Sequence, residues 1–339
     1  MSIDITQFDA DDRIDREQWD DHVRTSRGGT LFHTFDMLEL IERHASADLY
    51  PFIGYKGQEP VGVFPVFELS KGGISAAFSP PPRMGIPSMG PAPLNDGHLK
   101  RRKAERRLRR FVEGCLESID ERIGPRYSRV CTSVGVDDPR PFTWNEFDAS
   151  PRHTYVLAID RDPEDLKQSF SKSLRRYLDP DEDDAERFRI EERGTEAIEF
   201  IHEQVTARYE AQDRTYTVPL EFLLEAYETL PAGRLRPYVG AVDGDLASGI
   251  LVFEGPSTIY YSAGGGKPDV DFPINDLLHW RIIRDARDRG IERYDLCGAN
   301  TKRICTYKSK FNPDLATYYE VERGTPVMNA VSSLYRRLR

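Results

Sequence analysis

The sequence lacks the long apolar segments that direct a chain into or across a membrane. No apolar run approaches the roughly 20 residues of a membrane-spanning helix. The first residues, MSIDITQFDADDRIDREQW, are acidic and contain no apolar stretch of the kind found in a signal peptide. We therefore expect a cytoplasmic protein without an integral membrane segment.

Cysteine is scarce, and its placement argues against metal or nucleophile chemistry. No two of the four cysteines form a C-x-x-C pair, and none has a histidine at ligand spacing. The sequence therefore predicts no metal site and no permanently bound cofactor, and we expect reduced, partly buried thiols. Because a G-x-S-x-G motif and a recognisable Cys–His pair are also absent, the sequence gives no support for a covalent enzyme intermediate.

Positive charge is in deficit. The net charge is −10, and arginine greatly outnumbers lysine, a composition similar to that of an acidic, halophilic cytosolic protein. Such a chain repels nucleic-acid phosphates at long range, which argues against DNA as a partner. The exception is KRRKAERRLRR at 100–110, which is either a solvated helix face or a contact for a polyanion such as RNA.

The chain contains one passage twice. Residues 49–68 read LYPFIGYKGQEPVGVFPVFE, and residues 235–254 read LRPYVGAVDGDLASGILVFE. Both are an apolar run, a glycine-containing turn and a second apolar run, which predicts a β-hairpin. Either two similar hairpins match by chance, or a domain has been duplicated. Duplication would create a cleft between two domains, a favoured place for ligands.

The patterns predict alternating helices and strands in two domains, as the length of 339 residues suggests. In the first half we expect helices at 15–25, 34–45 (with Thr34 as N-cap) and 98–123, the first hairpin, an ordered Pro- and Gly-rich loop at 72–93, a strand at 128–136 and a linker at 137–151.

In the second half we expect helices at 163–178, 195–211, 219–230 and 273–290 (ending at Gly290), an acidic turn after 178, and strands at 153–160, 188–193, 236–253 (the second hairpin), 257–266, 292–297 and 316–322. This order predicts a mixed sheet flanked by helices, an α+β fold. We expect a first domain over 1–148, a second over 149–322, and a short basic helix at the C-terminus.

Four passages together resemble the FemAB-like transferases, which carry two GNAT-like domains in tandem. They are SFSKSLRRYL at 169–178; YYSAGGGKPD at 260–269 ahead of INDLLHWRIIRDARDRGIERYDLCG at 274–298; ICTYKSKFNP at 304–313; and the first hairpin. The sequence departs from the family at Lys310, where glycine is usual before the phenylalanine. It also has no coiled-coil arm, and R/Q-x-x-G-x-G/A, the usual pyrophosphate loop of GNAT proteins, is missing.

The resemblance implies an N-acyltransferase in which an amine attacks an acyl or aminoacyl group in the inter-domain cleft, with the tail 323–339 packed on the first domain. The donor would be acyl-CoA or aminoacyl-tRNA, and the acceptor a small-molecule or precursor amine, with phosphate as one expected feature. Two alternatives are an aminoacyl-tRNA-dependent ligase of the peptidoglycan-bridge type and a non-catalytic binding protein on the same fold.

Lys308 is the first candidate for chemistry. The resemblance gives the matching lysine an electrostatic role at the tetrahedral oxyanion, where a preorganised cation lowers the barrier. We expect it on a strand, with Tyr307 and Phe311 forming a dry aromatic wall. The alternative is a surface lysine that pairs with an acidic neighbour.

Further candidates would bind substrate. Arg175, Arg176 and Lys172 suit a phosphate, because guanidinium forks match its oxygens, although pairing with the acidic run at 181–184 is equally consistent. His279 is either a general base or a satisfied core histidine, and Asn275 is more simply a helix cap. The remaining candidates are Tyr216, Tyr260, Asn300 and Arg303.

Overall fold

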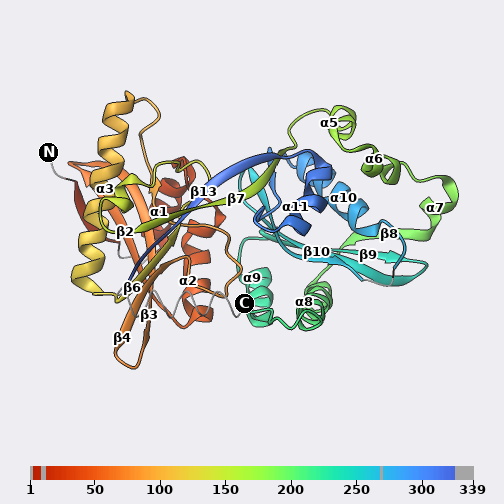
Figure 1. Cartoon of the computed structure of the whole chain (residues 1–339), viewed down its shortest axis with the longest axis horizontal. Helices are drawn as coiled ribbons and strands as arrows, with labels where there is room; N and C mark the ends of the chain where they lie inside the picture. Colours follow the sequence, from red (N-terminus) through yellow and green to blue (C-terminus); the bar gives the residue numbers. More distant parts are fainter. Residues whose placement is uncertain (1–2, 9–12, 268–269, 325–339) are drawn as a thin grey trace. The chain divides into compact units, whose positions relative to one another are not determined.

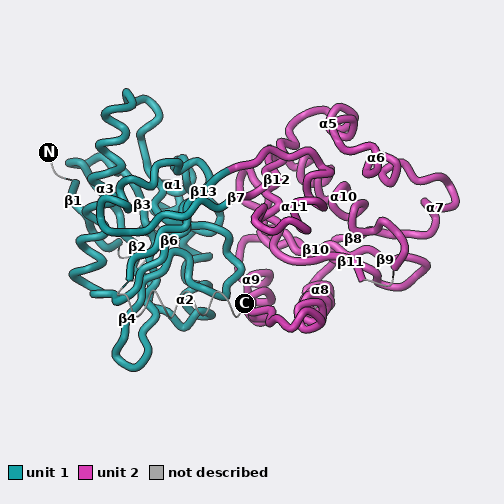
Figure 2. Tube along the Cα trace, in the orientation of Figure 1, with its two compact units in different colours: residues 1–152, 317–339 teal, residues 153–316 magenta. Residues whose placement is uncertain are grey.

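The computed structural model describes residues 3–8, 13–267 and 270–324. The chain forms two compact units, Met1–Arg152 with Thr317–Arg339, and His153–Ala316 (Figure 2). The C-terminal helix expected at 327–339 lies outside the described residues. None of the described helices is long and apolar enough to cross a bilayer.

Unit 1 is built on a sheet with the strand order β1-β2-β3-β4-β6-β13. The strands are β1 (Asp4–Gln7), β2 (Asp48–Lys56), β3 (Glu59–Lys71), β4 (Ile74–Ser79), β6 (Tyr127–Cys131) and β13 (Asp314–Gly324), and the short β5 (Ala92–Pro93) pairs with β3. All neighbours are antiparallel except β4 and β6, which are parallel and are connected through the long helix α3 (Arg101–Arg122).

Helices cover both faces of this sheet. In Figure 1, α3 lies on one side of β2 and β3, and α2 (Phe35–Ala45) lies on the other. The apolar face predicted for α3 is buried, and with the short α4 (Arg140–Thr143) it closes a core around Phe52, Phe64 and Phe111. The remaining helices of unit 1 are α1 (Arg13–Thr25) and the single turn η1 (Leu31–His33).

The strands of unit 2 continue the strand order as β7-β12-β11-β10-β9-β8. The strands are β7 (Asp148–Ala158), β8 (Phe188–Glu192), β9 (Leu235–Val242), β10 (Asp245–Glu254), β11 (Thr258–Gly266) and β12 (Arg293–Asp295). Here β11 and β12 are the parallel pair, and α10 (Ile274–Asp288) connects them. α8 (Thr195–Glu210) and α9 (Leu220–Thr229) lie on one side of β9 and β10, and α10 lies on the other (Figure 1).

The repeated passages are the same hairpin in both units. Leu49 faces Phe67 as Leu235 faces Phe253, and Gly54 faces Gly62 as Gly240 faces Ser248. At the repeated glycine a helix packs closely: a Cβ at Gly54 would lie 2.5 Å from the Phe111 ring of α3, and one at Gly240 would lie 2.6 Å from Ile274 of α10. The shared register, and the same close approach of a crossover helix, favour duplication over chance similarity.

Several sequence expectations needed correction. The helix expected at 163–178 is two helices, α5 (Pro163–Ser169) and α6 (Lys172–Leu178), because Ser171 caps the second with a side-chain bond to the Leu174 amide. The acidic turn contains α7 (Glu182–Arg187), capped by Asp181. The loop expected at 72–93 contains β4 and β5. The strand expected at 316–322 is present as β13, and it pairs with β6 of unit 1.

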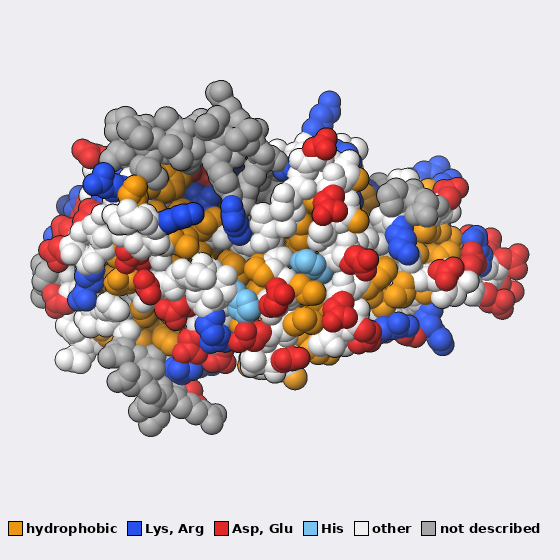
Figure 3. Space-filling model, turned by 90° about the horizontal axis from the view of Figure 1, so that it is seen from below, with side chains coloured by type: hydrophobic (Ala, Val, Ile, Leu, Met, Phe, Trp, Pro, Cys, Tyr) orange, Lys and Arg blue, Asp and Glu red, His pale blue; other side chains and the backbone are white. Residues whose placement is uncertain are grey.

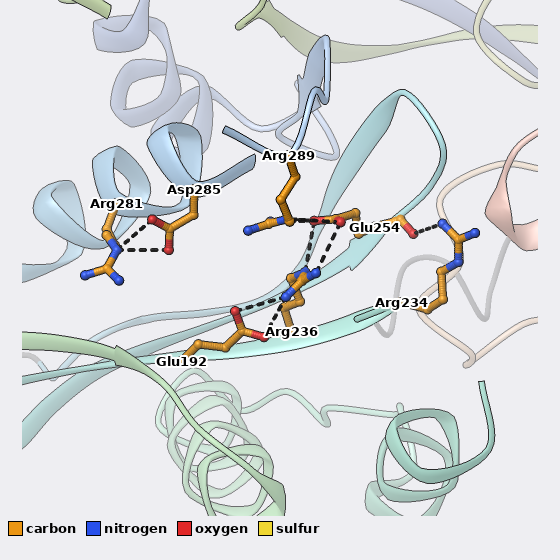
Figure 4. Close-up of polar contacts among 7 residues, drawn as sticks. All are labelled: Glu192, Arg234, Arg236, Glu254, Arg281, Asp285 and Arg289. Atoms are coloured by element: carbon orange, nitrogen blue, oxygen red, sulfur yellow. Dashed lines mark hydrogen bonds and ion pairs between the residues drawn. The ribbon is translucent and has the colours of Figure 1, made fainter. Parts of the chain in front are cut away.

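An arginine–glutamate cluster fastens β8, β9, β10 and the C-terminal end of α10 together (Figure 4). The carboxylate of Glu254, which is 8% exposed, accepts hydrogen bonds from Arg236 at 3.0 Å and from Arg289 at 2.5 Å. Arg236 also bonds Glu192 at 2.9 Å. The equivalent residue of the first repeat, Glu68, instead accepts hydrogen bonds from the hydroxyls of Tyr50 and Ser75.

Glu254→Gln should therefore destabilise the protein more than the matched change Glu68→Gln. Removing one partner of a largely buried ion pair costs about 3 kcal/mol. Weakening hydrogen bonds from two hydroxyls costs about 1 kcal/mol. Urea unfolding followed by fluorescence and circular dichroism measures both losses, and equal losses would contradict the assigned role of the cluster.

Candidate active site

The candidate site lies where the parallel strands of unit 2 separate. The ladder between β11 and β12 comprises three pairs, from Thr258–Arg293 to Tyr260–Asp295. β11 then continues to Gly266 and β12 ends at Asp295. The C-terminal ends of both strands and the N-terminal end of α10 meet here, which is where α/β sheets bind ligands. β11 also has a bulge at this level, since Val252 faces Tyr261 while Leu251 faces Ala263.

A tight turn follows β12. The Asp295 carboxylate accepts hydrogen bonds from the Thr154 hydroxyl at 2.5 Å and from the Cys297 amide at 2.8 Å. Cys297 has φ 50° and Gly298 has φ 88°, so the backbone reverses through left-handed conformations. Burial raises the pKa of Asp295, and the hydrogen bond from Thr154 opposes this shift.

The turn directs three carbonyls at one buried cation, Lys308. Its Nζ donates to the carbonyl oxygens of Leu296 at 2.5 Å, Cys297 at 2.7 Å and Gly298 at 3.1 Å. The Lys308 side chain is buried, which lowers its pKa, while Cys297 and Asp295 oppose the shift. An ammonium has three N–H donors, and all three are used here.

This geometry changes the interpretation of Lys308. The residue ends a helix, α11 (Lys302–Lys308), so the expectation of a strand is wrong. It is also not a surface lysine paired with an acid. Because its donors all bind the backbone, it has no N–H left for an oxyanion in this arrangement. Its direct effect is to hold the turn after β12 against α11.

A second polar cluster joins α11 and the turn η2 (Ser309–Phe311) to the first turn of α10. The Tyr307 hydroxyl donates to the Asp276 carboxylate at 2.7 Å and accepts a hydrogen bond from the Asn275 amide. Lys310 forms an ion pair with the same carboxylate oxygen, and its Nζ lies 3.9 Å from the Tyr307 ring centroid. Burial, reinforced by Asp276, raises the pKa of Tyr307 well above its usual value, so the phenol stays protonated.

His279 lies beneath this cluster. Its Nδ1 is 3.0 Å from the Tyr294 hydroxyl, and its ring contacts those of Tyr261 and Phe311 at centroid distances of 5.7 and 5.2 Å. Burial lowers its pKa to about 3, and the charges of Lys310 and Lys308 add to the shift. His279 is therefore neutral at physiological pH and a weak base. This fits a hydrogen-bonded core histidine better than a general base.

An arginine that the sequence reasoning missed closes the β11 side of the site. The guanidinium of Arg208 on α8 donates to the Gly264 carbonyl at 2.6 Å, and the Tyr261 hydroxyl donates to the same oxygen at 2.7 Å. Gly264 and Gly265 have φ values of 142° and 135°. A Cβ at Gly265 would lie 2.1 Å from Arg208, so glycine is required for this approach.

Tyr216 lies in the loop between α8 and α9. Its ring packs on those of His202 and Tyr209 at centroid distances of 5.3 and 5.4 Å. Its buried hydroxyl has no hydrogen-bond partner within the described part of the chain. Burial raises the pKa of Tyr216, with a smaller contribution from Tyr209.

Other predicted residues lie around the site with different roles. Asn300 is committed to structure, because it bonds both the amide and the carbonyl of His153 on β7. Tyr260 points away from the core face that Tyr261 occupies. Lys172, Arg176 and Arg303 are exposed, and Arg175 donates to the Gln168 side chain at 2.6 Å.

The acidic run after α6 does not neutralise these cations. Asp184 pairs with Arg187, and Asp181 caps α7. α6 also adjoins the polar cluster, because the Ser171 amide donates to the Lys310 carbonyl at 2.8 Å. Within the described residues, no three His, Cys, Asp or Glu side chains are grouped closely enough to hold a metal ion.

Comparison with known proteins agrees with this architecture. Residues 167–309 match the acetyltransferase (GNAT) domain family, a segment that contains Asp276, His279, Tyr307 and Lys308. The structure of FemX superposes with a TM-score of 0.70 at 13% identity, covering 93% of this chain and 96% of that one. The chain has a FemAB-like tandem GNAT fold.

Two further structures support the fold. L-PGS from Bacillus licheniformis superposes with a TM-score of 0.57 at 10% identity, covering 98% of this chain and 97% of that one. A conserved protein of unknown function from Bacteroides thetaiotaomicron superposes with a TM-score of 0.58 at 12% identity, covering 91% of this chain and 97% of that one. No curated protein sequence matches the chain. At these identities the similarity shows the fold alone.

The pKa of His279 gives this site a defined acid sensitivity. The folded-state pKa of about 3 lies below the ordinary value of 6.5, so the unfolded chain binds more protons between these values. Stability from neutral His279 is therefore present above pH 6.5 and is lost as the pH falls towards 3, by about 3 kcal/mol at pH 4. Urea unfolding at pH 7 and pH 4 measures the loss.

His279→Gln is the control, because other groups also titrate in this range. Its stability should fall by about 3 kcal/mol less than that of the wild type between the two pH values. An identical pH dependence in the two proteins would show that His279 is not held neutral in the fold.

Proposed function

We propose that the chain is an N-acyltransferase that moves an acyl or aminoacyl group from an activated donor to an amine acceptor. The observation that carries the proposal is the polar cluster of Asn275, Asp276, Tyr307 and Lys310 beyond the parallel strands of a domain that matches the GNAT family. The similarity to FemX supports this class of reaction.

In this proposal the chain's residues position the reactants. The acceptor nitrogen attacks the donor carbonyl carbon, a C–N bond forms, and the C–S or C–O bond to the leaving group breaks. The proton lost by nitrogen balances the one gained by the leaving thiol or hydroxyl. Asp276 orients the amine, because it is a buried carboxylate beside the strand ends. Tyr307 donates its one hydroxyl hydrogen to Asp276, and so holds that carboxylate in place.

Lys308 has a supporting role in this scheme. It fixes the turn after β12 and contributes positive charge from a buried position. Tyr307 and Phe311 lie in the same short segment, on α11 and η2, and are held in place with it. Arg175, Arg176 and Lys172 on α6 are the proposed contacts for a phosphate of the donor or acceptor. Tyr216 offers its unpaired hydroxyl to the substrate.

The donor is tested directly. The purified chain is incubated with labelled acetyl-CoA or with labelled aminoacyl-tRNA and a panel of amines, and label transfer is followed by mass spectrometry. Transfer from either donor supports the proposal and identifies the donor class. Loss of transfer on ribonuclease treatment points to the tRNA-dependent ligase. Binding of donors without turnover under any condition would establish the non-catalytic alternative.

Asp276→Asn and Tyr307→Phe should each lower kcat/KM by about 100-fold, because the first changes the carboxylate that orients the amine and the second removes the hydroxyl that holds this carboxylate. Asp288→Asn is the matched control, since it removes an exposed carboxylate at the other end of α10. Thermal melting separates a catalytic loss from misfolding. Full activity of Asp276→Asn would show that the site is misassigned.

A further inference from the structure

The basic run at 100–110 forms a face of α3 that the proposed transfer chemistry does not use. The segment carries eight basic residues and one acidic residue in a chain of net charge −10. Part of the run is neutralised locally, because Arg101 pairs with Glu105, Arg107 with Glu59, and Arg109 with Glu113. Of these three arginines, Arg107 is the least exposed, with 9% of its side chain accessible.

Four cations at the start of α3 have no such partner. Lys100, Arg102, Lys103 and Arg106 are exposed, and none forms an ion pair or a side-chain hydrogen bond anywhere in the described structure. Elsewhere many arginines have carboxylate partners, as in the cluster of Figure 4. On the face of the molecule drawn in Figure 3, acidic side chains are scattered among the basic ones.

The charged side chains of α3 are arranged unfavourably relative to its helix dipole. The first turn has no acidic residue, and Lys100 provides no side-chain cap. Glu117 and Glu121 lie in the C-terminal half of α3, about three turns or more beyond Arg106. Cations near a helix N-terminus and anions near its C-terminus each cost a few tenths of a kcal/mol. The helix therefore keeps a positive N-terminal half at some cost in stability, as expected for a surface that meets an external anion.

The placement of the charges defines the shape of that anion. Arg102 and Arg106 are one turn apart, so their side chains project in one line about 6 Å apart. The basic segment spans about 15 Å, after which Glu113, Glu117 and Glu121 continue the same line on the helix. A flat anionic membrane would meet both halves and be repelled by the acidic one. A single polyanionic strand can contact the basic half alone.

We propose that this face of α3 binds RNA through its phosphodiester backbone. Guanidinium groups suit phosphate because their donors match two of its oxygens. In the same unit, Trp144 is 57% exposed and lies under the Arg140 guanidinium. Arg140 pairs with Glu105 of α3. Trp144 therefore provides an aromatic surface close to α3 on which an unpaired base can stack. The proposal rests on unit 1 and is independent of the transferase reaction.

The test is fluorescence anisotropy of a labelled 20-nucleotide single-stranded RNA with the full chain at 50 to 300 mM salt. The variant Arg102→Glu/Lys103→Glu/Arg106→Glu should weaken binding by about tenfold or more. It should also reduce the slope of log affinity against log salt by about 2, since each lost phosphate contact removes ~0.7.

The matched control is Lys56→Glu/Lys71→Glu/Arg284→Glu, which changes the net charge equally at three exposed cations outside α3. It should leave the affinity within about twofold, because contact charges and not net charge dominate the salt-dependent term. Equal loss in both variants, or no RNA binding at 50 mM salt, would overturn the proposal. A third outcome would also overturn it: the chain binds phosphatidylserine vesicles but not RNA, and the α3 variant abolishes the vesicle binding.

Discussion

The contact between the Lys308 ammonium and three consecutive backbone carbonyls holds the candidate site together. The carbonyls of 296–298 point the same way only because Cys297 and Gly298 take left-handed conformations. Such a group of buried oxygens would be costly without a donor. A cation that satisfies all three fixes α11, and α11 carries Tyr307 into contact with the start of α10. The arrangement of the polar cluster therefore depends on a lysine that need not touch substrate.

Duplication explains the architecture, and the two copies differ where chemistry is expected. Both units have a hairpin in the same register, a parallel strand pair and a crossover helix packed on a hairpin glycine. In unit 1 the end of the parallel pair is filled by the chain itself. The Met89 amide bonds the Cys131 carbonyl, and the Ser133 hydroxyl bonds the Met89 carbonyl. Unit 2, in contrast, has polar side chains at its corresponding strand ends.

Sequence patterns predicted the elements that have a strong hydrophobic periodicity. They failed where the contacts of a single side chain determine the local structure. The apolar face of α3 and the glycine at position 290, which follows the cap of α10 with φ 84°, were predictable because periodicity and glycine preference act locally. Lys308 was expected on a strand, but it ends the helix α11. The helix there is stabilised by carbonyls distant from this motif. Asp276 and Arg208 were missed, because each acquires its role only from partners on other elements.

The most direct measurement is amide hydrogen exchange in Lys308→Met compared with the wild type. The account predicts that peptides covering residues 295–299 exchange at least about tenfold faster in the variant, because unsatisfied carbonyls open the turn. Peptides in the β9–β10 hairpin should be unchanged. If the turn kept its protection without the ammonium, the central role given to this contact would be contradicted.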